Sequence, residues 1–455
     1  MRKKIKQLQK PFKKELIEKI ALETGFIKRN RKLNATKFLE TCVFNSNSIC
    51  DISLNDLSTQ YNLETGISIS KQALNDKFNR NAVDFFRKVF ENVLYSHSNI
   101  SKENLVYCES LFKRIRIMDS SRIELPAKFR EIYGGNGGGA SKAAAKFNVE
   151  YDLLTGEFNN VGFFSGTKSD PACMHEVIDD VEAGDLCIKD LGYFNLKVFG
   201  EINKKDAYYI SKIKSTTSVY SDNDDYEKYY YNTKRNSEPR KIDIAKVTET
   251  LCEGESIELD NIYIGQAHSI KSRLIITKLP KEIKENRRKK REKKASKRNL
   301  KSSSDKFDGA NAYITNITKE KLDMKSIAHL YKLRWQIEIM FKVWKSIFDI
   351  NKINNVKLER FECFVYSKLI YILLSSTIIN IAKIKGNNKQ NLSLIKAFKV
   401  LKFSNNTLKN ICYCSFNKLY QSINDIIKRI LEYTNYIETK KDTPSIDNII
   451  ASTLI

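Results

Sequence analysis

The sequence has few of the side chains that bind zinc. It contains only four histidines, and its nine cysteines show no repeated spacing. Cys412 and Cys414 are closely spaced, but no second such pair completes the four ligands that a structural zinc site needs. The sequence therefore argues against a zinc finger, and the odd number of scattered cysteines argues against a disulfide framework. We expect free thiols in a reducing compartment.

The sequence also lacks a hydrophobic run long enough to cross a bilayer. Its most apolar segment, LIYILLSSTII at residues 369–379, is too short to span and is bounded by Lys368 and Asn380. The basic N-terminal stretch has no apolar run of the kind found in a signal peptide. We therefore expect a cytoplasmic protein with no membrane partner, in which residues 369–379 form a buried helix.

Basic residues, in contrast, are abundant. The chain carries 79 Lys and Arg against 54 Asp and Glu, a formal net charge of +25. This excess favours a polyanionic partner, because Lys and Arg gain affinity by releasing counterions condensed on phosphate backbones. The alternative is compositional, since an A·T-rich genome would also encode a chain rich in Lys, Asn and Ile. The 455 residues, 41% of them hydrophobic, allow about two to four domains.

Residues 1–105 show mostly helical periodicity, and we expect a helical DNA-binding domain there. Within it, residues 53–79 predict a short helix, a break at Gly66 and a second helix capped by Ser70, which is the layout of a helix-turn-helix. The second helix could also offer Lys77 to a DNA groove, and its candidate DNA contacts are three polar side chains: Lys71, Gln72 and Asn75. Helical hairpins are common in any helical domain, so a purely structural role is the alternative.

A change of periodicity near residue 106 predicts an α/β sheet domain. The expected strands lie at 111–119, 146–164 (a hairpin turning at Thr155-Gly156), 185–190 and 206–215, with helices at 173–183 and 194–203. The glycine-rich stretch 134–146 matches neither a P-loop nor a dinucleotide-binding fingerprint. We therefore expect that stretch to be a flexible loop near the rim of the sheet.

A β-rich insertion is predicted at residues 216–310, after this sheet domain. It ends in a basic arm, residues 281–306, which has the densest concentration of basic residues in the chain. The arm is either a solvated, partly helical run or a segment that tracks phosphates, and its place in one block beside the sheet domain favours the second. The sheet domain would resume at 311–355, and the apolar periodicity of 356–455 predicts a C-terminal helical region.

The segment LYKLRWQIEIMFKVWKS, residues 330–346, is predicted to form one helix with two stripes. At 100° per residue, its polar side chains fall within an arc of about 80°: Tyr331, Arg334, Glu338, Lys342 and Lys345. The neighbouring stripe is apolar and is expected to bury against a core: Leu330, Leu333, Ile337, Met340, Phe341, Trp344 and Phe348. The polar stripe would then lie at the edge of that core.

Three acids are candidates for metal chemistry. Asp119 and Asp190 each end a predicted strand, and Glu338 lies on the later helix. An α/β domain places its ligands at strand ends on the sheet rim. Three carboxylates there would hold two Mg²⁺ ions, which prefer oxygen ligands and stabilise the attacking and leaving oxygens of a phosphoryl transfer. Taken alone, each acid is more often a turn or cap residue.

The order and spacing of these residues resemble a known family. Tyr331-x2-Arg334-x3-Glu338-x6-Lys345 resembles the Tyr-Arg-Glu-Lys (YREK) signature of one group of DDE transposases from bacterial insertion sequences, the IS-four-like transposases. IMDSSRIELP resembles the motif around that family's first catalytic Asp, and GDLCIKDLGYF resembles the motif around its second. The resemblance covers roughly residues 50–400 and is most specific in the helix that carries the Glu.

The resemblance implies a ribonuclease-H-like catalytic core at residues 106–215 and 311–355. Asp119, Asp190 and Glu338 would be its catalytic residues and would bind two Mg²⁺ ions, with Mn²⁺ able to substitute. The enzyme would act as an endonuclease and transfer strands in DNA transposition, a form of DNA recombination. A hairpin intermediate at the element end is usual in this group.

The resemblance also implies the residues and partners that handle DNA. Tyr331, Arg334 and Lys345 would contact phosphates near the cleaved end, and Lys342 is added from helical geometry alone. The partners would be double-stranded DNA, as terminal repeats and as target, and a second copy of the chain in a homodimer on DNA. The expected location is the bacterial cytoplasm, with association to the nucleoid when DNA is bound.

One feature departs from the family pattern. Better-known relatives carry a Trp in the insertion, just before the strand that leads to the Glu helix, and this Trp stacks on a flipped base. The two Trp of this chain are Trp335 and Trp344, outside that region. The aligned stretch FDGANAYITN offers Tyr313 or Phe307 as a stacking face, and both fit the core of a strand equally well.

Two other functions compete with an active transposase. One is a catalytically silent, transposase-derived DNA-binding repressor that occupies element ends. The other is a stand-alone nuclease that never joins strands. The intact acids and the intact YREK spacing favour the active enzyme.

Overall fold

The computed structural model describes residues 1–28, 33–44, 52–102, 111–137, 141–169, 178–231, 239–266, 270–296, 309–386, 392–409 and 411–434. The chain forms two compact units from interleaved segments. The first comprises Met1–Glu109, Ser120–Lys168 and Gln336–Asp447, and the second comprises Ser110–Asp119, Ser169–Trp335 and Asn448–Ile455. The predicted α/β fold class, with helical N- and C-terminal regions, is confirmed.

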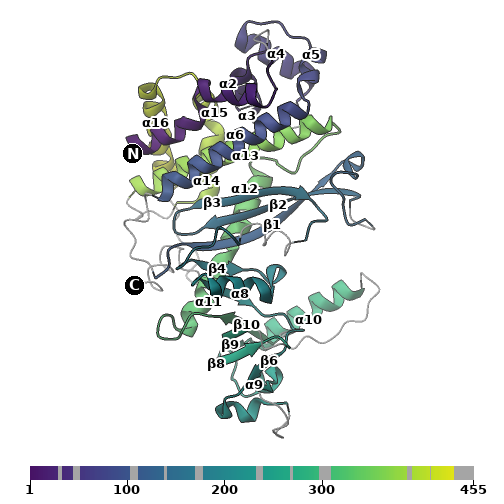
Figure 1. The fold of residues 1–455 in the computed structure, drawn as a ribbon, viewed down its shortest axis with the longest axis vertical. Coiled ribbons are helices and arrows are strands. Elements are labelled where there is room, and N and C mark those ends of the chain that lie inside the picture. Colours follow the sequence, from purple (N-terminus) through teal and green to yellow (C-terminus); the bar gives the residue numbers. More distant parts are fainter. Residues whose placement is uncertain are drawn as a thin grey trace. The chain divides into compact units, whose positions relative to one another are not determined.

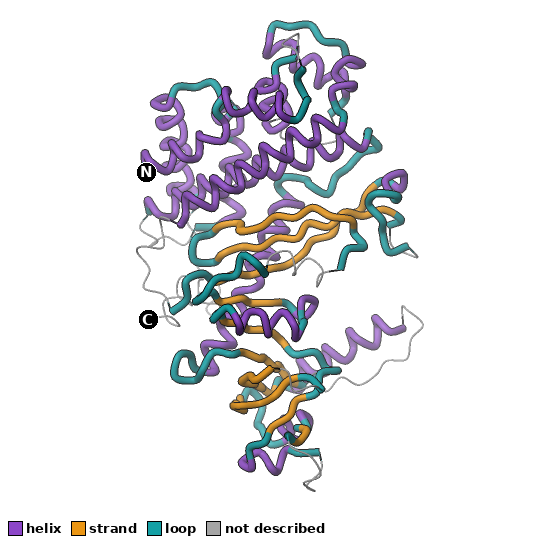
Figure 2. The backbone as a smooth tube through the Cα atoms, in the orientation of Figure 1, coloured by secondary structure: helices purple, strands orange, loops and turns teal. Residues whose placement is uncertain are grey.

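The first unit is mostly helical (Figure 2). Its helices are α1 (Arg2–Gln9), α2 (Lys14–Glu23), α3 (Ala35–Phe44), α4 (Leu54–Thr65), α5 (Lys71–Lys77), α6 (Arg80–Lys102), α12 (Gln336–Ser346), α13 (Leu358–Lys385), α14 (Leu394–Phe403), α15 (Asn405–Leu408) and α16 (Phe416–Tyr433). Helix α13 packs along α6 and also contacts α3, α14 and α16 (Figure 1). A helix that is apolar all round must be enclosed in this way, which is why α13 forms the centre of the unit.

The predicted buried helix at residues 369–379 lies inside α13 and is confirmed. The expectation that this segment is too short to cross a bilayer is wrong for the whole helix, because among the described residues α13 is the one helix long and apolar enough to cross a membrane by length and composition. However, 94% of its most apolar window is buried inside the protein. Helix α13 is therefore a core helix.

The predicted hairpin is also present in the first unit. Strands β2 (Ala143–Asp152) and β3 (Glu157–Ser165) pair in antiparallel fashion. The turn between them contains Gly156 at φ 74°, a left-handed conformation that glycine adopts without strain. The hairpin prediction and its turn position are therefore confirmed.

The predicted glycine-rich loop is wrong at its C-terminal end. Residues 143–146 belong to β2, and Gly134 forms an isolated bridge with Ala143. Ala143, Ala144 and Ala145 are fully buried, and a Cβ on Gly166 would lie only 2.7 Å from the Cβ of Ala144. Small side chains thus let β2 pack closely, so the stretch is a strand for reasons of packing that local composition did not reveal.

The second unit is built on a mixed sheet. Its strands are β4 (Leu186–Lys189), β5 (Tyr208–Lys212), β6 (Val219–Ser221), β7 (Arg240–Lys241), β8 (Ser256–Ile264), β9 (Ile270–Lys278) and β10 (Ala310–Thr315), together with the first part of β1 (Ile115–Leu125). The order is β3-β2-β1 in the first unit and β1-β4-β5-β10-β9-β8-β6-β7 in the second. Strand β4 is parallel to both β1 and β5, in agreement with the ribonuclease-H-like core.

Strand β1 is longer than predicted. The sequence placed Asp119 at a strand end, but β1 continues through Ser120 to Leu125. What ends next to Asp119 is the pairing with β4, whose last pair is Met118 with Lys189. From Ser120 to Leu125, side chains on β1 alternate between exposed or partly exposed positions and buried ones, as in a strand with one face covered. Asp119 therefore lies within β1, where its parallel neighbour ends.

The insertion is β-rich, as predicted, and contains β6 to β9 and the helices α9 (Ile244–Glu249) and α10 (Lys281–Ser296). The other helices of the second unit are α8 (Leu196–Lys204), which confirms the helix predicted near 194–203, and α11 (Met324–Lys332). Of the helix predicted at 173–183, the part up to residue 177 lies outside the described residues, and 178–183 forms bends and turns.

The predicted single helix at 330–346 is interrupted. Helix α11 ends at Lys332, a 3₁₀ turn η6 covers Leu333–Trp335, and α12 begins at Gln336. A 3₁₀ turn advances about 120° per residue, so the single polar row expected from a uniform 100° does not continue unbroken. Hydrophobic periodicity cannot distinguish one 3₁₀ turn from α-helix, because both place apolar residues inward at similar spacing.

Candidate active site

Strands β1 and β4 bring two of the predicted acids to neighbouring positions in the second unit. Asp119 follows the last residue of β1 that pairs with β4, and Asp190 follows the last residue of β4. Asp190 also caps the 3₁₀ turn η4 (Leu191–Tyr193), because its side chain accepts a hydrogen bond from the Gly192 N–H at 3.4 Å. Both strands run in parallel, so their ends present both carboxylates at one edge of the sheet.

Arg334 joins these two acids. Its Nη1 lies 3.3 Å from Asp119 Oδ2, and its Nε lies 3.4 Å from Asp190 Oδ1. The side chains of Asp119 and Asp190 are 21% and 38% exposed, so both carboxylates remain accessible to a ligand. The structure thus brings together three residues that the sequence singled out and that are separated by up to 215 positions.

Tyr331 lies beside this group. It is buried, and its ring centroid is 5.0 Å from that of Tyr313 on β10. Burial raises the pKa of the Tyr331 phenol well above its usual range, and the nearby charge of Asp190 raises it further. The phenol is therefore protonated at neutral pH and is available as a hydrogen-bond donor.

One basic residue near Asp190, Lys212, was missed by the sequence analysis. Lys212 ends β5, and its Nζ lies 5.5 Å from the centre of the Tyr331 ring. Burial lowers the pKa of Lys212, as do the positive charges of Arg287 and Arg334, whereas Asp190 opposes the shift. The one available signal was that Lys212 ends a strand parallel to β4, but lysines are too numerous in this chain for that position to stand out.

Glu338 lies in the first turn of α12 and is exposed. The predicted apolar stripe beside it is confirmed, because all seven of its members are buried: Leu330, Leu333, Ile337, Met340, Phe341, Trp344 and Phe348. Within the first unit, Trp344 packs edge-on against Phe147 and Phe341. This packing fixes α12 and leaves Glu338 on its exposed side.

The two lysines of the polar row differ in their surroundings. Lys345 is half-buried, and its ammonium donates a hydrogen bond to the Arg122 carbonyl at 3.2 Å. Burial lowers the pKa of Lys345. Lys342 is exposed. Lys345 is thus held on the first unit beside β1, whereas Lys342 lies in solvent one turn after Glu338.

The residues present suit a hard divalent cation. Asp119 and Asp190 offer partly exposed carboxylate oxygens that already share one cationic partner, and Mg²⁺ prefers oxygen ligands of this kind. In the part of the chain that the structure describes, no three His, Cys, Asp or Glu side chains gather into a metal-binding group. The two aspartates would therefore supply the first ligands of such a site.

The predicted helix-turn-helix layout is confirmed in the first unit. Helix α4 ends at Gly66, which has φ 68°, and α5 begins after Ser70, whose hydroxyl accepts a hydrogen bond from the Ala73 N–H. The three residues proposed for DNA contact lie on α5, two of them exposed and the third half-buried: Lys71, Gln72 and Asn75. Their contact with DNA remains a prediction.

The two candidates for a base-stacking side chain have different outcomes. Tyr313 is 4% exposed and packs against Tyr331, so it is a core residue of β10 and presents no free face. Phe307 lies outside the described residues. Trp335, in contrast, is 52% exposed.

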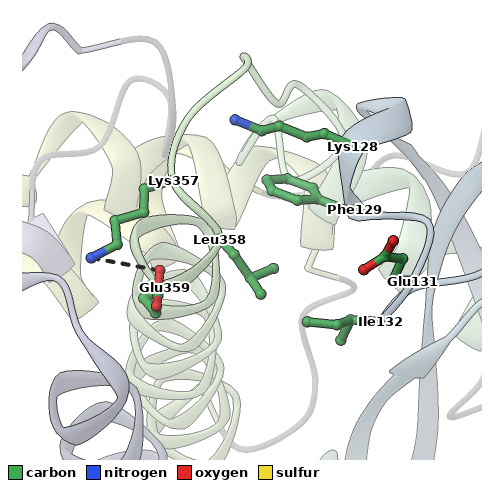
Figure 3. A pocket seen from close by; sticks show the side chains of 7 residues that line it. All are labelled: Lys128, Phe129, Glu131, Ile132, Lys357, Leu358 and Glu359. Atoms are coloured by element: carbon green, nitrogen blue, oxygen red, sulfur yellow. Dashed lines mark ion pairs between the residues drawn. The ribbon is translucent and has the colours of Figure 1, made fainter.

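A cavity of about 340 Å³ lies elsewhere, in the first unit (Figure 3). It is lined by Lys128, Phe129, Glu131, Ile132, Lys357, Leu358 and Glu359. None of these residues was singled out by the sequence, and Lys357 and Glu359 form an ion pair of 3.8 Å at its edge. The acids of the candidate active site take no part in this cavity.

Comparisons with known proteins identify relatives of this chain. The family model of the transposase DDE domain matches residues 110–374. The chain is 41% identical over 412 residues to the transposase for insertion sequence element IS1151 of Clostridium perfringens, covering 88% of this chain and 86% of the relative. It is 37% identical over 405 residues to the transposase for insertion sequence element IS231F of Bacillus thuringiensis subsp. israelensis, covering 87% and 84%.

A solved structure is also similar at a lower level. The piggyBac transposase in a synaptic complex with hairpin DNA covers 98% of this chain and 88% of its own, with 12% sequence identity and a TM-score of 0.45. A similarity at this level supports no inference about residues or reaction.

Proposed function

The chain belongs to the DDE transposases of insertion sequences, which are DNA phosphoryl-transfer enzymes that catalyse DNA transposition, and from this membership we propose a specific catalytic site. Asp119, Asp190 and Glu338 are its catalytic carboxylates and bind two Mg²⁺ ions, with Mn²⁺ able to substitute. The observation that carries the proposal is the double ion pair of Arg334 with Asp119 and Asp190. Two separate strands and a later turn converge on one point, and both carboxylates stay partly exposed, so a metal ion can reach them.

The proposed reaction follows from the charges at this point. When bound, the two ions would activate water and stabilise the attacking and leaving oxygens of an in-line displacement. Asp119 and Asp190 hold and orient them from the edge of the sheet, and Glu338 supplies the third carboxylate from the start of α12. The product is a free 3′-hydroxyl on the element, which then attacks a second phosphodiester.

The remaining members of the YREK signature position DNA in this proposal. Arg334 presents a planar, permanently charged fork that suits phosphate as well as carboxylate. Tyr331 donates its phenol O–H, and Lys345 and Lys342 supply ammonium groups. With the two carboxylates holding metal, the Arg334 guanidinium would instead bind a phosphate of the cleaved strand. The chain is thereby assigned to the YREK group of its family.

The wider arrangement is part of the same proposal. Helix α5 binds the terminal repeats through Lys71, Gln72 and Asn75, because an exposed second helix of a helix-turn-helix suits a major groove. Residues 1–105 form the DNA-binding domain, 106–215 with 311–355 the catalytic core, 216–310 the insertion and 356–455 the C-terminal region. The enzyme acts as a homodimer on double-stranded DNA in the bacterial cytoplasm.

The test is cleavage of DNA that carries candidate terminal repeats. Purified protein is incubated with this DNA and Mg²⁺, and cleavage and binding are measured for the variants Asp119→Ala, Asp190→Ala and Glu338→Ala. Each is expected to abolish cleavage and to retain binding. The matched control is Glu201→Ala, an exposed acid of α8 that pairs with Lys204, and it should cleave as the wild type does.

Unchanged cleavage in any of the three variants would remove that acid from the site. Tight binding of the ends without cleavage by the wild type would identify a silent repressor. Cleavage without joining to a target would identify a nuclease. Measuring binding, cleavage and joining on the same DNA distinguishes these outcomes from one another.

A further inference from the structure

Helix α10 is attached to the catalytic sheet by an arginine. The Arg287 guanidinium donates hydrogen bonds to the Ala310 carbonyl at 3.1 Å and to Asn311 Oδ1 at 2.8 Å, both on β10. Arg287 is half-buried, unlike most of its neighbours on α10. Arg287 therefore holds α10 against β10, the strand that pairs with β5, and its positive charge lies at the sheet.

Arg287 lies close to Lys212. On the paired strands β5 and β10, Lys212 lies directly opposite Tyr313. The charge of Arg287 lowers the pKa of both side chains, against the opposing effect of burial at Tyr313. Lys212 in turn lies over the ring of Tyr331, next to the Arg334–Asp190 ion pair. The second unit thus contains a row of three cations, Arg334, Lys212 and Arg287, that begins at the catalytic acids.

Such a row suits an anion. Like charges brought together in a partly desolvated place repel one another, and burial adds to the cost of each charged group. The negative charges of Asp119 and Asp190 offset part of this repulsion. In the proposed site, however, these carboxylates also bind metal ions, so less of their negative charge is left for the row of cations. A phosphate group would then supply the negative charge that the row needs, and Lys and Arg are the side chains that bind phosphates.

The outer face of α10 continues the row. The helix begins next to β9 and β10 and leads outward from them (Figure 1). Its exposed basic side chains are Lys281, Lys284, Arg288, Lys289, Lys290 and Lys293. At about 1.5 Å per residue its 16 residues extend about 24 Å, the length of about seven base pairs of duplex DNA.

We propose that Lys212 and Arg287 bind a DNA phosphate beside Asp190, and that the exposed basic face of α10 continues this contact along the target duplex. Long, solvent-facing ammonium and guanidinium groups contact phosphates without reading bases. Joining requires a second duplex at the same acids, whereas recognition of the element's own ends is assigned to α5. The inference rests on the proposed function, because it takes Asp119 and Asp190 as the catalytic acids.

The first experiment neutralises the outer face of α10. The variant Arg288→Gln, Lys289→Gln, Lys290→Gln and Lys293→Gln is compared with a matched control on exposed positions of α14 and α16, Lys396→Gln, Lys399→Gln, Lys418→Gln and Arg429→Gln. Binding of a duplex of arbitrary sequence is measured against salt concentration. The α10 variant should flatten the slope of log K against log salt by about 2 to 4, since each phosphate contact contributes about 0.9.

Strand transfer separates target DNA from the element ends. With precleaved ends, the α10 variant should join to target at least about tenfold less well at 150 mM salt, while Mg²⁺-dependent cleavage of the ends stays within about twofold. An equal loss in the matched control, or an equal loss of end cleavage, would overturn the assignment to target DNA. An unchanged salt slope would overturn the contact itself.

The second experiment tests Lys212. Lys212→Gln should reduce both cleavage and the salt slope, by about 1 in the slope, and Lys212→Arg should restore the slope because it keeps the charge. Lys271→Gln, at an exposed position of β9, is the control and should change neither. Equal behaviour of Lys212→Gln and Lys271→Gln, with both proteins folded by circular dichroism, would refute the role of Lys212.

The two proposals can fail separately. If Asp119→Ala still cleaves, the catalytic assignment is wrong, but the salt slopes still report whether Lys212 and α10 hold DNA. If Asp119→Ala is inactive and the salt slopes of the Lys212 and α10 variants are unchanged, the catalytic assignment stands. The proposed DNA contacts of Lys212 and α10 are then refuted.

Discussion

Arg334 Nη1 lies 3.3 Å from Asp119 Oδ2, although 215 positions separate the two residues in the chain. Asp119 is set by the middle of β1, and Arg334 by the 3₁₀ turn between α11 and α12. The same guanidinium also reaches Asp190, so one cation is shared by the two carboxylates proposed to bind metal. The ion pair and a metal ion therefore compete for the same oxygens.

This competition gives a prediction for Arg334→Gln. Removing the positive charge should strengthen Mn²⁺ binding by roughly 1 kcal/mol, about fivefold, because repulsion of the ion is lost. Cleavage should nevertheless fall about 100-fold, because the clamp on the phosphate is lost. Mn²⁺ binding is measured by calorimetry, with Arg130→Gln, an exposed arginine of the first unit, as control. Weaker Mn²⁺ binding in Arg334→Gln would contradict the competition.

The buried acid next to the catalytic strands should be essential for stability. Asp185 is fully buried just before β4 and binds Arg114 Nε at 2.8 Å and Arg116 Nη1 at 3.2 Å. Asp185→Ala removes the carboxylate that these two guanidinium groups share, one of which is fully buried, and should lower the free energy of unfolding by about 3–5 kcal/mol. Urea denaturation measures the effect, with Glu201→Ala expected within about 0.5 kcal/mol of wild type. A midpoint unchanged in Asp185→Ala would show that the network is dispensable.

His97 should make stability depend on pH. Its Nε2 accepts a hydrogen bond from the Phe158 N–H, so Nδ1 carries the proton and donates to Thr377 Oγ1 at 2.6 Å. Burial lowers the pKa of His97 to about 3. Between that value and the ordinary value of 6.5, the unfolded chain binds a proton that the folded chain does not, so stability falls as pH drops below about 6.5.

The size of this effect can be isolated with a variant. From pH 7 to pH 5, the free energy of unfolding of the wild type should fall by about 2 kcal/mol more than that of His97→Gln. The carboxylates contribute equally to both proteins and cancel in the comparison. Parallel pH profiles for the two would mean that His97 is already protonated in the folded state.

Two glycines should respond oppositely to substitution by alanine. Gly156 has φ 74°, and a Cβ there would lie 2.7 Å from Asn380 Oδ1, so Gly156→Ala should destabilise by about 1–3 kcal/mol. Gly200 lies within α8, and a Cβ there would meet nothing within 4 Å, so Gly200→Ala should stabilise by about 0.5–1 kcal/mol. Thermal unfolding of both variants checks the pair, and the same sign for both would contradict it.

Local signals predicted much of the fold. The hairpin at Gly156, the cap at Ser70 and the buried helix α13 were all visible, because turn chemistry, capping and hydrophobicity act over a few residues. The errors arose where neighbours outside the local segment decided the outcome. Residues 143–146 form a strand because they pack closely with Gly166. At Asp119 only the pairing of β1 with β4 ends, and the strand itself continues to Leu125.

The sequence by itself determined the family: two ordered aspartates and the spacing of Tyr331, Arg334, Glu338 and Lys345 predicted a DDE transposase, because such a motif consists of residue types and their spacing along the chain. Only the tertiary structure decided that Arg334 is bound to Asp119 and Asp190, that Tyr313 is a core residue, and that Lys212 and Arg287 stand beside them. These contacts join residues that lie far apart in the chain, and strand pairing and a 3₁₀ turn bring them together. Residues so widely separated in sequence produce no local periodicity that could have predicted their contact.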